Sequence, residues 1–166
     1  MPTFPVYVAA EAKLVIERAE AEAKAHLQGG VSPIHLLLAL LRSPSSREEL
    51  SRLVGPEVPL NALEDAAESE ARQPKAWLFD PRDSVPFTAA AKAAVSRAFD
   101  WAQRRPHTVV QPGHLLLGLF RPPARTRLFG IWAAPEDTVT HLLHTVGLTS
   151  DTLAAKLSSL PELPEP

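Results

Sequence analysis

The sequence predicts an all-α fold in which two pseudo-symmetric repeats of four helices each pack as one compact domain. Three observations predict this fold. Shifting the chain by 79 residues lays residues 6–42 over residues 85–121 without a gap, and 15 of these 37 aligned positions are identical. Apolar residues recur at helical spacing within each copy. Most of the 17 prolines fall between these periodic segments, where they separate helices rather than break them.

Each copy begins with a long amphipathic helix. The apolar stripe consists of Ala12, Val15, Ile16, Ala19, Ala23 and Leu27 in the first copy, and of Ala91, Ala94, Val95, Ala98 and Ala102 in the second. The small alanines allow a neighbouring helix to approach closely. Thr88 stands where the second copy of this helix needs an N-cap.

A second, buried helix is predicted in each copy. Ser32-Pro33 and Gln111-Pro112 each place a polar residue before a proline at the first helical position, which is a helix start signal. The two helices continue through Leu41 and Phe120 and are apolar nearly all round. We therefore expect them to be the buried centres of the two repeats, with residues 36–40 and 115–119 the most deeply buried.

Two more helices complete each repeat. They are expected at 47–54, ended by Gly55, and at 60–71 in the first copy, and at 136–146, ended by Gly147, and at 150–160 in the second. The predicted division is a first repeat at 1–72, a linker at 73–86, a second repeat at 87–160 with an insertion at about 122–135, and a disordered tail at 161–166.

Composition excludes several classes of protein. Apolar residues make up 45% and charged residues 22% of the chain, which is typical of a globular domain. The longest unbroken apolar run, residues 36–41, is too short to cross a bilayer, and the N-terminus lacks the pattern of a secretory signal. The absence of cysteine excludes disulfides, thiolate metal sites and cysteine nucleophiles. We expect a cytoplasmic protein without a cofactor.

The sequence around 85–121 resembles the Clp N-terminal repeat. The segments that carry the resemblance are Val-Pro-Phe-Thr-Ala-Ala-Ala-Lys at 85–92 and Gln-Pro-Gly-His-Leu-Leu-Leu-Gly-Leu-Phe-Arg at 111–121, and His-Leu-Leu-Leu recurs at 35–38. The resemblance covers residues 6–160. It implies a domain that binds substrate proteins, adaptors or a Clp ATPase and catalyses nothing itself.

The chain is interpreted as a stand-alone double-repeat protein without ATPase modules, because no phosphate-binding loop motif occurs in it. It also departs from the family at one position in each repeat. Members of the ClpC type carry a glutamate before the histidine, which helps to hold the guanidinium of phosphorylated arginine. Ile34 and Gly113 stand there in this sequence, so the charge-assisted hydrogen bonds of that site are lost. We therefore expect phosphoarginine to bind poorly.

The histidines give no sign of catalysis. His35 and His114 occupy matching positions at the start of apolar helices, and we interpret both as core residues hydrogen-bonded to the backbone. Asp137, His141 and His144 share one helix face in a spacing that suits metal ligands, but the sequence offers no obvious fourth group. Without a nucleophile motif either, neither a metal site nor an enzyme is predicted.

Basic residues gather in the second half of the chain. Seven occur between Lys92 and Arg127, against the single acid Asp100. A solvated helix face and a docking surface for an acidic partner both explain such a cluster, whereas the lack of a recognition motif argues against nucleic acid.

Four aromatic residues lie in segments outside the repeat, at Trp77, Phe79, Phe129 and Trp132. They either pack against one another between the repeats or contact a partner. The candidate partner-binding residues are Arg105, Arg121, Arg125, Arg127, Phe129, Trp132, Trp77 and Phe79.

Two functions remain open from the sequence. The first is a non-catalytic adaptor or regulator of the Clp chaperone and protease system that binds client proteins, adaptors or a Clp ATPase. The alternative is a small-molecule sensor or sequestering protein that uses the groove between the repeats. A monomer is favoured, with no nucleic-acid or membrane partner.

Overall fold

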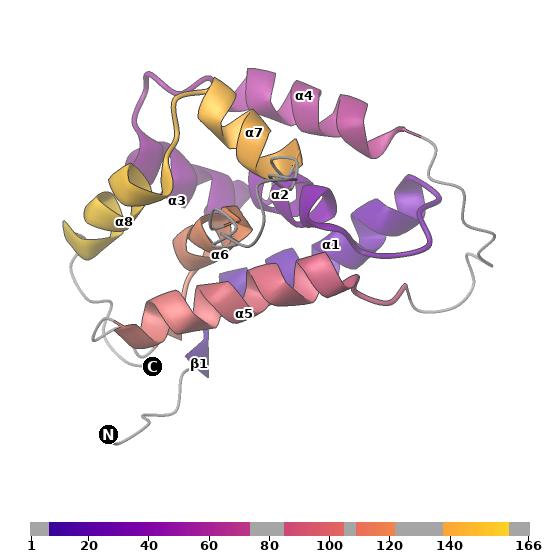
Figure 1. Ribbon diagram of the computed structural model, residues 1–166, viewed down its shortest axis with the longest axis horizontal. Coiled ribbons are helices and arrows are strands. Elements are labelled where there is room, and N and C mark those ends of the chain that lie inside the picture. The colour runs from indigo at the N-terminus through magenta and orange to yellow at the C-terminus, as the bar shows by residue number, and fades with distance from the viewer. Residues whose placement is uncertain (1–6, 74–84, 105–108, 122–137, 160–166) are drawn as a thin grey trace, which may run out of the picture.

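The computed structural model describes residues 7–73, 85–104, 109–121 and 138–159. Eight helices and one pair of two-residue strands form within these residues (Figure 1). In chain order they are β1 (Tyr7–Val8), α1 (Ala10–Ala25), α2 (Pro33–Arg42), α3 (Pro44–Val54), α4 (Leu60–Ala71), α5 (Ala89–Arg104), β2 (Val109–Val110), α6 (Pro112–Leu119), α7 (Thr138–Thr145) and α8 (Ser150–Ser159). The predicted all-α fold with two repeats of four helices is confirmed.

Several helix ends follow the predicted signals, but α3 begins at Pro44 rather than at residue 47, and Leu27 lies beyond the end of α1 with an exposed side chain. The hydroxyl oxygen of Thr88 accepts a hydrogen bond from the Ala91 amide at 3.2 Å, as an N-cap does. Gly55 and Gly147 follow α3 and α7 with φ angles of 92° and 80°, a left-handed conformation that glycine adopts at no steric cost. Most of the expected linker, the insertion at about 122–135 and the tail at 161–166 lie outside the described residues.

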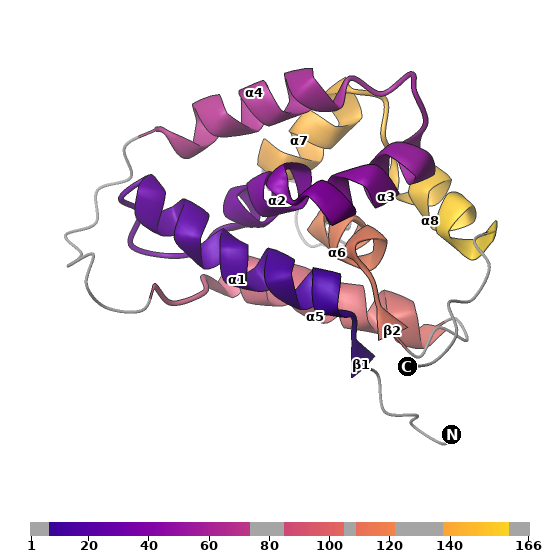
Figure 2. The same cartoon turned by 180° about the vertical axis from the view of Figure 1, so that it is seen from behind.

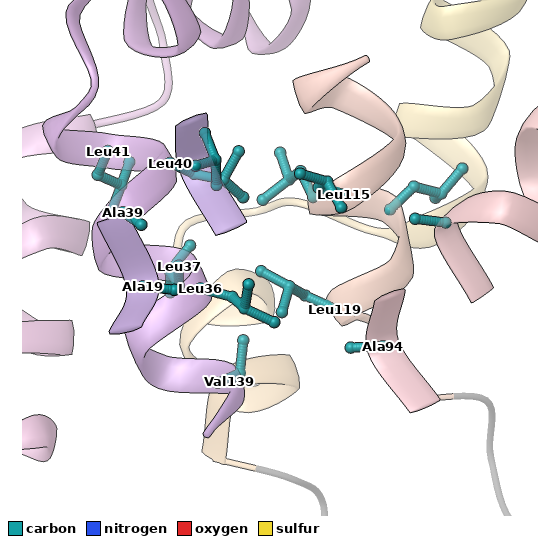
Figure 3. Close-up of a cluster of buried hydrophobic side chains, with 14 of the residues drawn as sticks. Ala19, Leu36, Leu37, Ala39, Leu40, Leu41, Ala94, Leu115, Leu119 and Val139 are labelled. Carbon is teal, nitrogen blue, oxygen red and sulfur yellow. The ribbon is translucent and has the colours of Figure 1, made fainter. Parts of the chain in front are cut away.

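The apolar helices α2 and α6 lie at the centre of the molecule, as predicted. The helices α1 and α5 cover one side of this pair, α4 and α7 cover the other, and α3 and α8 close one end (Figures 1 and 2). Residues 33–41 and 112–119 are all buried. In Figure 3, Leu40 lies opposite Leu115, and Leu36 lies opposite Leu119. These two pairs are equivalent under the 79-residue shift, so the core repeats itself about a pseudo-twofold axis.

The strands were not predicted, and they connect one repeat to the other. β1 pairs in parallel with β2, with Val8 opposite Val110, while Val31 forms an isolated bridge with Phe87. Under the 79-residue shift, Val8 corresponds to Phe87 and Val31 corresponds to Val110. The bridge between Val31 and Phe87 is therefore the same pairing with the two repeats exchanged. The segment that precedes the first helix of each repeat therefore pairs with the segment that precedes the buried helix of the other.

The buried helix of the second repeat approaches its neighbour more closely than the sequence alone indicates. A Cβ atom at Gly118 would lie 2.3 Å from the carbonyl oxygen of Ala94 on α5. The equivalent position in the first repeat is Ala39, which is completely buried. Glycine at 118 thus allows the α5 and α6 backbones to pack against each other without an intervening side chain.

We expect Gly118→Ala to destabilise the protein. Replacing a helical glycine by alanine ordinarily stabilises the folded protein by about 0.5–1 kcal/mol. Overpacking against rigid backbone destabilises it by roughly 1–3 kcal/mol, which outweighs that gain. Gly113→Ala in the same helix is the matched control, because its new Cβ would meet the flexible end of Leu157 instead. Urea denaturation of both variants measures the difference in the free energy of unfolding. A Gly118→Ala protein as stable as the Gly113→Ala protein would contradict the close packing.

Candidate functional site

Only one of the predicted partner-binding residues can be placed. Arg121 follows α6 with an exposed side chain, and its backbone amide donates to the hydroxyl oxygen of Thr140 on α7 at 3.0 Å. This hydrogen bond fixes where the chain leaves the core. The remaining predicted residues lie outside the described residues: Arg105, Arg125, Arg127, Phe129, Trp132, Trp77 and Phe79.

The other basic residues of the second repeat have different environments. Lys92 and Arg104 are exposed on α5, whereas Arg97 is half-buried and its Nε donates to the carbonyl oxygen of Gly118 at 2.8 Å. The Arg104 guanidinium lies 5.6 Å from the centre of the half-buried Trp101 ring, within range of a cation–π contact. Trp101 was not among the predicted partner-binding residues, although its spacing of three residues from Arg104 along a helix was a usable signal.

The two core histidines have the predicted structural role. His35 and His114 are buried, and Nδ1 of each ring accepts the backbone N–H of the residue three positions earlier, at 3.0 Å from Ser32 and 3.1 Å from Gln111. Each histidine therefore completes a capping box at the start of its helix. The duplicated histidines are explained by helix capping.

The metal hypothesis gains no support from the described part of the chain. His141 and His144 are both exposed on α7, and Asp137 lies outside the described residues. Within the described ranges, no group of three histidine or carboxylate side chains is arranged to hold a metal ion.

The two positions that depart from the ClpC pattern are both buried. Ile34 is part of the core of α2. The backbone amide of Gly113 donates to Oε1 of Glu49, on α3 of the other repeat, at 3.1 Å. Burial raises the pKa of the Glu49 carboxyl, and the charge of Glu11 acts in the same direction, against the hydrogen bond from Gly113. Glu49, which the sequence did not indicate, thus places a carboxylate beside Gly113.

We expect phosphoarginine to bind weakly or not at all. A glutamate side chain at 113 would have to displace Leu157, whose Cδ2 lies 2.7 Å from a Cβ built at Gly113, and Ile34 supplies no charge at the equivalent position. Calorimetric titration measures the affinity, with arginine and inorganic phosphate as separate controls. Sub-micromolar binding would contradict the expectation, and its loss in Glu49→Gln would then identify the replacement acid.

A group of charged side chains, here called the charged junction, joins the helices of the first repeat. Its members are Glu22 and His26 from the end of α1, Arg42 from α2, Arg47 from α3, and Glu64 and Glu68 from α4. Arg42 is its centre, since its guanidinium donates to Glu22 at 2.6 Å, to Glu64 at 3.2 Å and to Glu68 at 2.7 Å. Three donors of one guanidinium therefore hold α1 and α4 against α2.

The junction fixes the charge of Glu68. Burial raises the pKa of this carboxyl, but hydrogen bonds from Arg72, His26 and Arg42 together lower it from 4.5 to about 2. The carboxylate form is therefore strongly favoured in the folded chain.

The lowered pKa predicts a loss of stability in acid. Because Glu68 has its lower pKa only when folded, it contributes up to about 3 kcal/mol above pH 4.5, and this contribution disappears as pH falls towards 2. We expect Glu68→Gln to flatten the dependence of unfolding free energy on pH between 4.5 and 2. Asp65→Asn, at an exposed position on the same helix, is the control and should leave that slope unchanged. An unaltered slope in Glu68→Gln would refute the assignment.

The fold resembles the solved N-terminal domains of two chaperones and a third solved structure. The N-terminal domain of Hsp104 from Candida albicans aligns with a TM-score of 0.67 and 16% identity over 92% of this chain and 90% of that one. The N-terminal domain of the chaperone ClpD from Arabidopsis thaliana aligns with a TM-score of 0.57 and 20% identity over 94% of both chains. A structure described in work on a malarial protein secretion system aligns with a TM-score of 0.72 and 20% identity over 91% of both chains.

A family model built from sequences matches this chain and agrees with the fold. The sequence model of the Clp repeat N-terminal domain matches residues 8–127, so this chain belongs to the Clp repeat N-terminal domain family. Comparison with curated protein sequences gave no match. Clp N-domains are non-catalytic, protein-binding modules of Clp ATPases. In the described part of the chain, no helix has both the length and the apolar character needed to cross a membrane.

Proposed function

We propose that this Clp N-domain is an adaptor or regulator of a Clp chaperone or protease in the cytoplasm, where it engages client proteins, adaptors or a Clp ATPase. Membership of a family of protein-binding domains carries the proposal. The 166 residues contain no phosphate-binding loop motif, so any coupling to ATP hydrolysis requires a separate ATPase module.

The second repeat is proposed to hold the partner-specific surface. The exposed Arg121 leads directly from the buried helix α6 into residues 122–135, the segment that has no counterpart in the first repeat. Arginine and tryptophan are enriched among residues that dominate binding energies, and this segment contains Arg125, Arg127 and Trp132. The second repeat also exposes Lys92 and Arg104, which favour a partner with acidic groups.

A triple variant tests this surface. We expect Arg125→Ala, Arg127→Ala and Trp132→Ala together to abolish capture of a Clp ATPase subunit or client from native lysate, with captured proteins identified by mass spectrometry. Removing exposed interface side chains leaves no cavity, so helicity and melting temperature should hardly change. A buried aromatic replaced by alanine would instead cost roughly 3–5 kcal/mol.

The matched control replaces two cations and one large apolar residue on the first repeat. Lys13, Leu14 and Arg52 are all exposed, and their replacement by alanine should leave capture intact. Normal stability with normal capture in the Arg125, Arg127 and Trp132 variant would eliminate the insertion as the binding surface. Loss of both stability and capture would assign these residues to packing.

A further inference from the structure

The second repeat keeps two arginines of the first repeat but not the acid between them. Under the 79-residue shift, Arg18, Arg42 and Glu22 correspond to Arg97, Arg121 and Trp101. In the first repeat, Glu22 pairs with Arg42 at 2.6 Å and with Arg18 at 3.9 Å. A tryptophan at this position cannot form either ion pair, because an indole only donates hydrogen bonds. The second repeat therefore has the same cations but not their shared carboxylate.

The acids that α4 contributes to Arg42 have no counterpart either. Glu64 and Glu68 lie one helical turn apart on α4, and both accept hydrogen bonds from Arg42, while other cations of the first repeat share them. The fourth helix of the second repeat, α8, contains no glutamate, and its one acid is Asp151 in the first turn. Among the described side chains, no acid lies within ion-pair distance of Arg121.

Arg121 lies outside its helix, whereas Arg42 lies inside one. The helix α2 continues through Arg42, but α6 ends at Leu119, so the exposed side chain of Arg121 follows the helix end. The helix α5 lies alongside α6 (Figure 1), and Nε of Arg97 donates to the carbonyl oxygen of Gly118, three residues before Arg121. This hydrogen bond holds the side of α5 that carries Arg97 next to the chain that leads to Arg121.

Trp101 and Arg104 continue the same side of α5. They follow Arg97 by four and seven residues, a spacing that places all three on one helix face. The guanidinium of Arg104 lies 5.6 Å from the centre of the half-buried Trp101 ring. Asp100, the one acid of α5, is exposed, and among the described side chains it forms no ion pair with Arg104. A guanidinium over an aromatic face keeps the N–H donors in its plane available to a carboxylate.

We propose that Trp101, Arg104 and Arg121 form a docking surface, here called the α5 surface, for an acidic helix of a partner protein. The inference rests on the proposed function, since the partner is the client, adaptor or ATPase engaged there, and it adds the chemistry by which that partner is recognised. In the first repeat, the arginine at the equivalent position binds carboxylates one helical turn apart on a packed helix. A partner helix with the same spacing supplies these groups to the second repeat. Arg97 is a positioning residue, because its side chain holds α5 against α6.

A synthetic helical peptide tests the surface on the intact protein. The probe is an alanine-based helix that carries two glutamates four residues apart, and its control has glutamines in their place. Nuclear magnetic resonance of the isotope-labelled protein should show saturable shifts at the Trp101 indole N–H and at the backbone amides of Arg104 and Arg121 with the glutamate peptide alone. Equal shifts with the glutamine peptide, or shifts confined to the first repeat, would overturn the proposal.

Paired substitutions measure the contribution of the two exposed arginines. We expect Arg104→Gln with Arg121→Gln to weaken binding of the glutamate peptide by roughly tenfold, the effect of losing two exposed ion pairs. Lys13→Gln with Arg52→Gln, which removes two exposed cations from the first repeat, is the matched control and should leave the affinity unchanged. Equal affinities in the two variants would contradict the α5 surface.

Other occupants are separate outcomes of the same titration. An oligonucleotide of thymidines that shifts these signals at lower concentration than the glutamate peptide would assign the surface to nucleic acid. The same shifts on concentrating the protein alone would assign it to a second copy. Either result overturns the proposal.

Capture from native lysate separates this inference from the proposed function. Capture of a Clp ATPase subunit or client that is unchanged in the Arg104→Gln, Arg121→Gln protein would leave the proposed function standing and overturn the α5 surface. No capture by the unmodified protein would count against the proposed function, and the peptide titration would then decide the α5 surface by itself.

Discussion

The fold depends on reciprocal contacts between the repeats. The backbone amide of Ala9 donates to the carbonyl oxygen of Val110 at 3.0 Å, and the amide of Thr88 donates to that of Val31 at 2.9 Å. These are the same hydrogen bond made twice, once in each direction. Each bond fixes where a long helix begins relative to a buried helix of the other repeat. Because α2 and α6 are buried against each other, neither repeat completes its core without its counterpart.

The two repeats use this shared frame differently. Glu22 in the first repeat and Trp101 in the second occupy equivalent positions. Glu22 is part of the charged junction, whereas the ring of Trp101 lies under the guanidinium of Arg104. The first repeat therefore joins its helices through paired charges at Arg42, whereas the second packs the α5 and α6 backbones closely at Gly118. This divergence leaves the second repeat with few acidic groups on α5, in keeping with the proposed acidic partner.

The sequence predicted what depends on local chemistry. Local signals span only a few residues, so the sequence shows them directly. They are the helical spacing of apolar residues, the prolines at helix starts, the glycines after helix ends and the duplicated histidines. The strand pairs were missed because two residues are too short to show alternation. Glu49 and the charged junction were missed because they join residues 17–64 positions apart, and no local pattern reports such contacts. For the partner-binding residues, only the position of Arg121 could be compared with the structure.

The equivalence of the two backbone pairings has a consequence for how such a chain can arise. A single repeat carries both halves of the contact, a segment before its first helix and a segment before its buried helix. Two separate identical copies could therefore satisfy the same bonds as a twofold-symmetric dimer, with each copy contributing one of each. Joining the copies in one polypeptide preserves that interface and removes its dependence on protein concentration. It also allows the two halves to change independently. The equivalent positions 39 and 118, for example, hold alanine in the first repeat and glycine in the second.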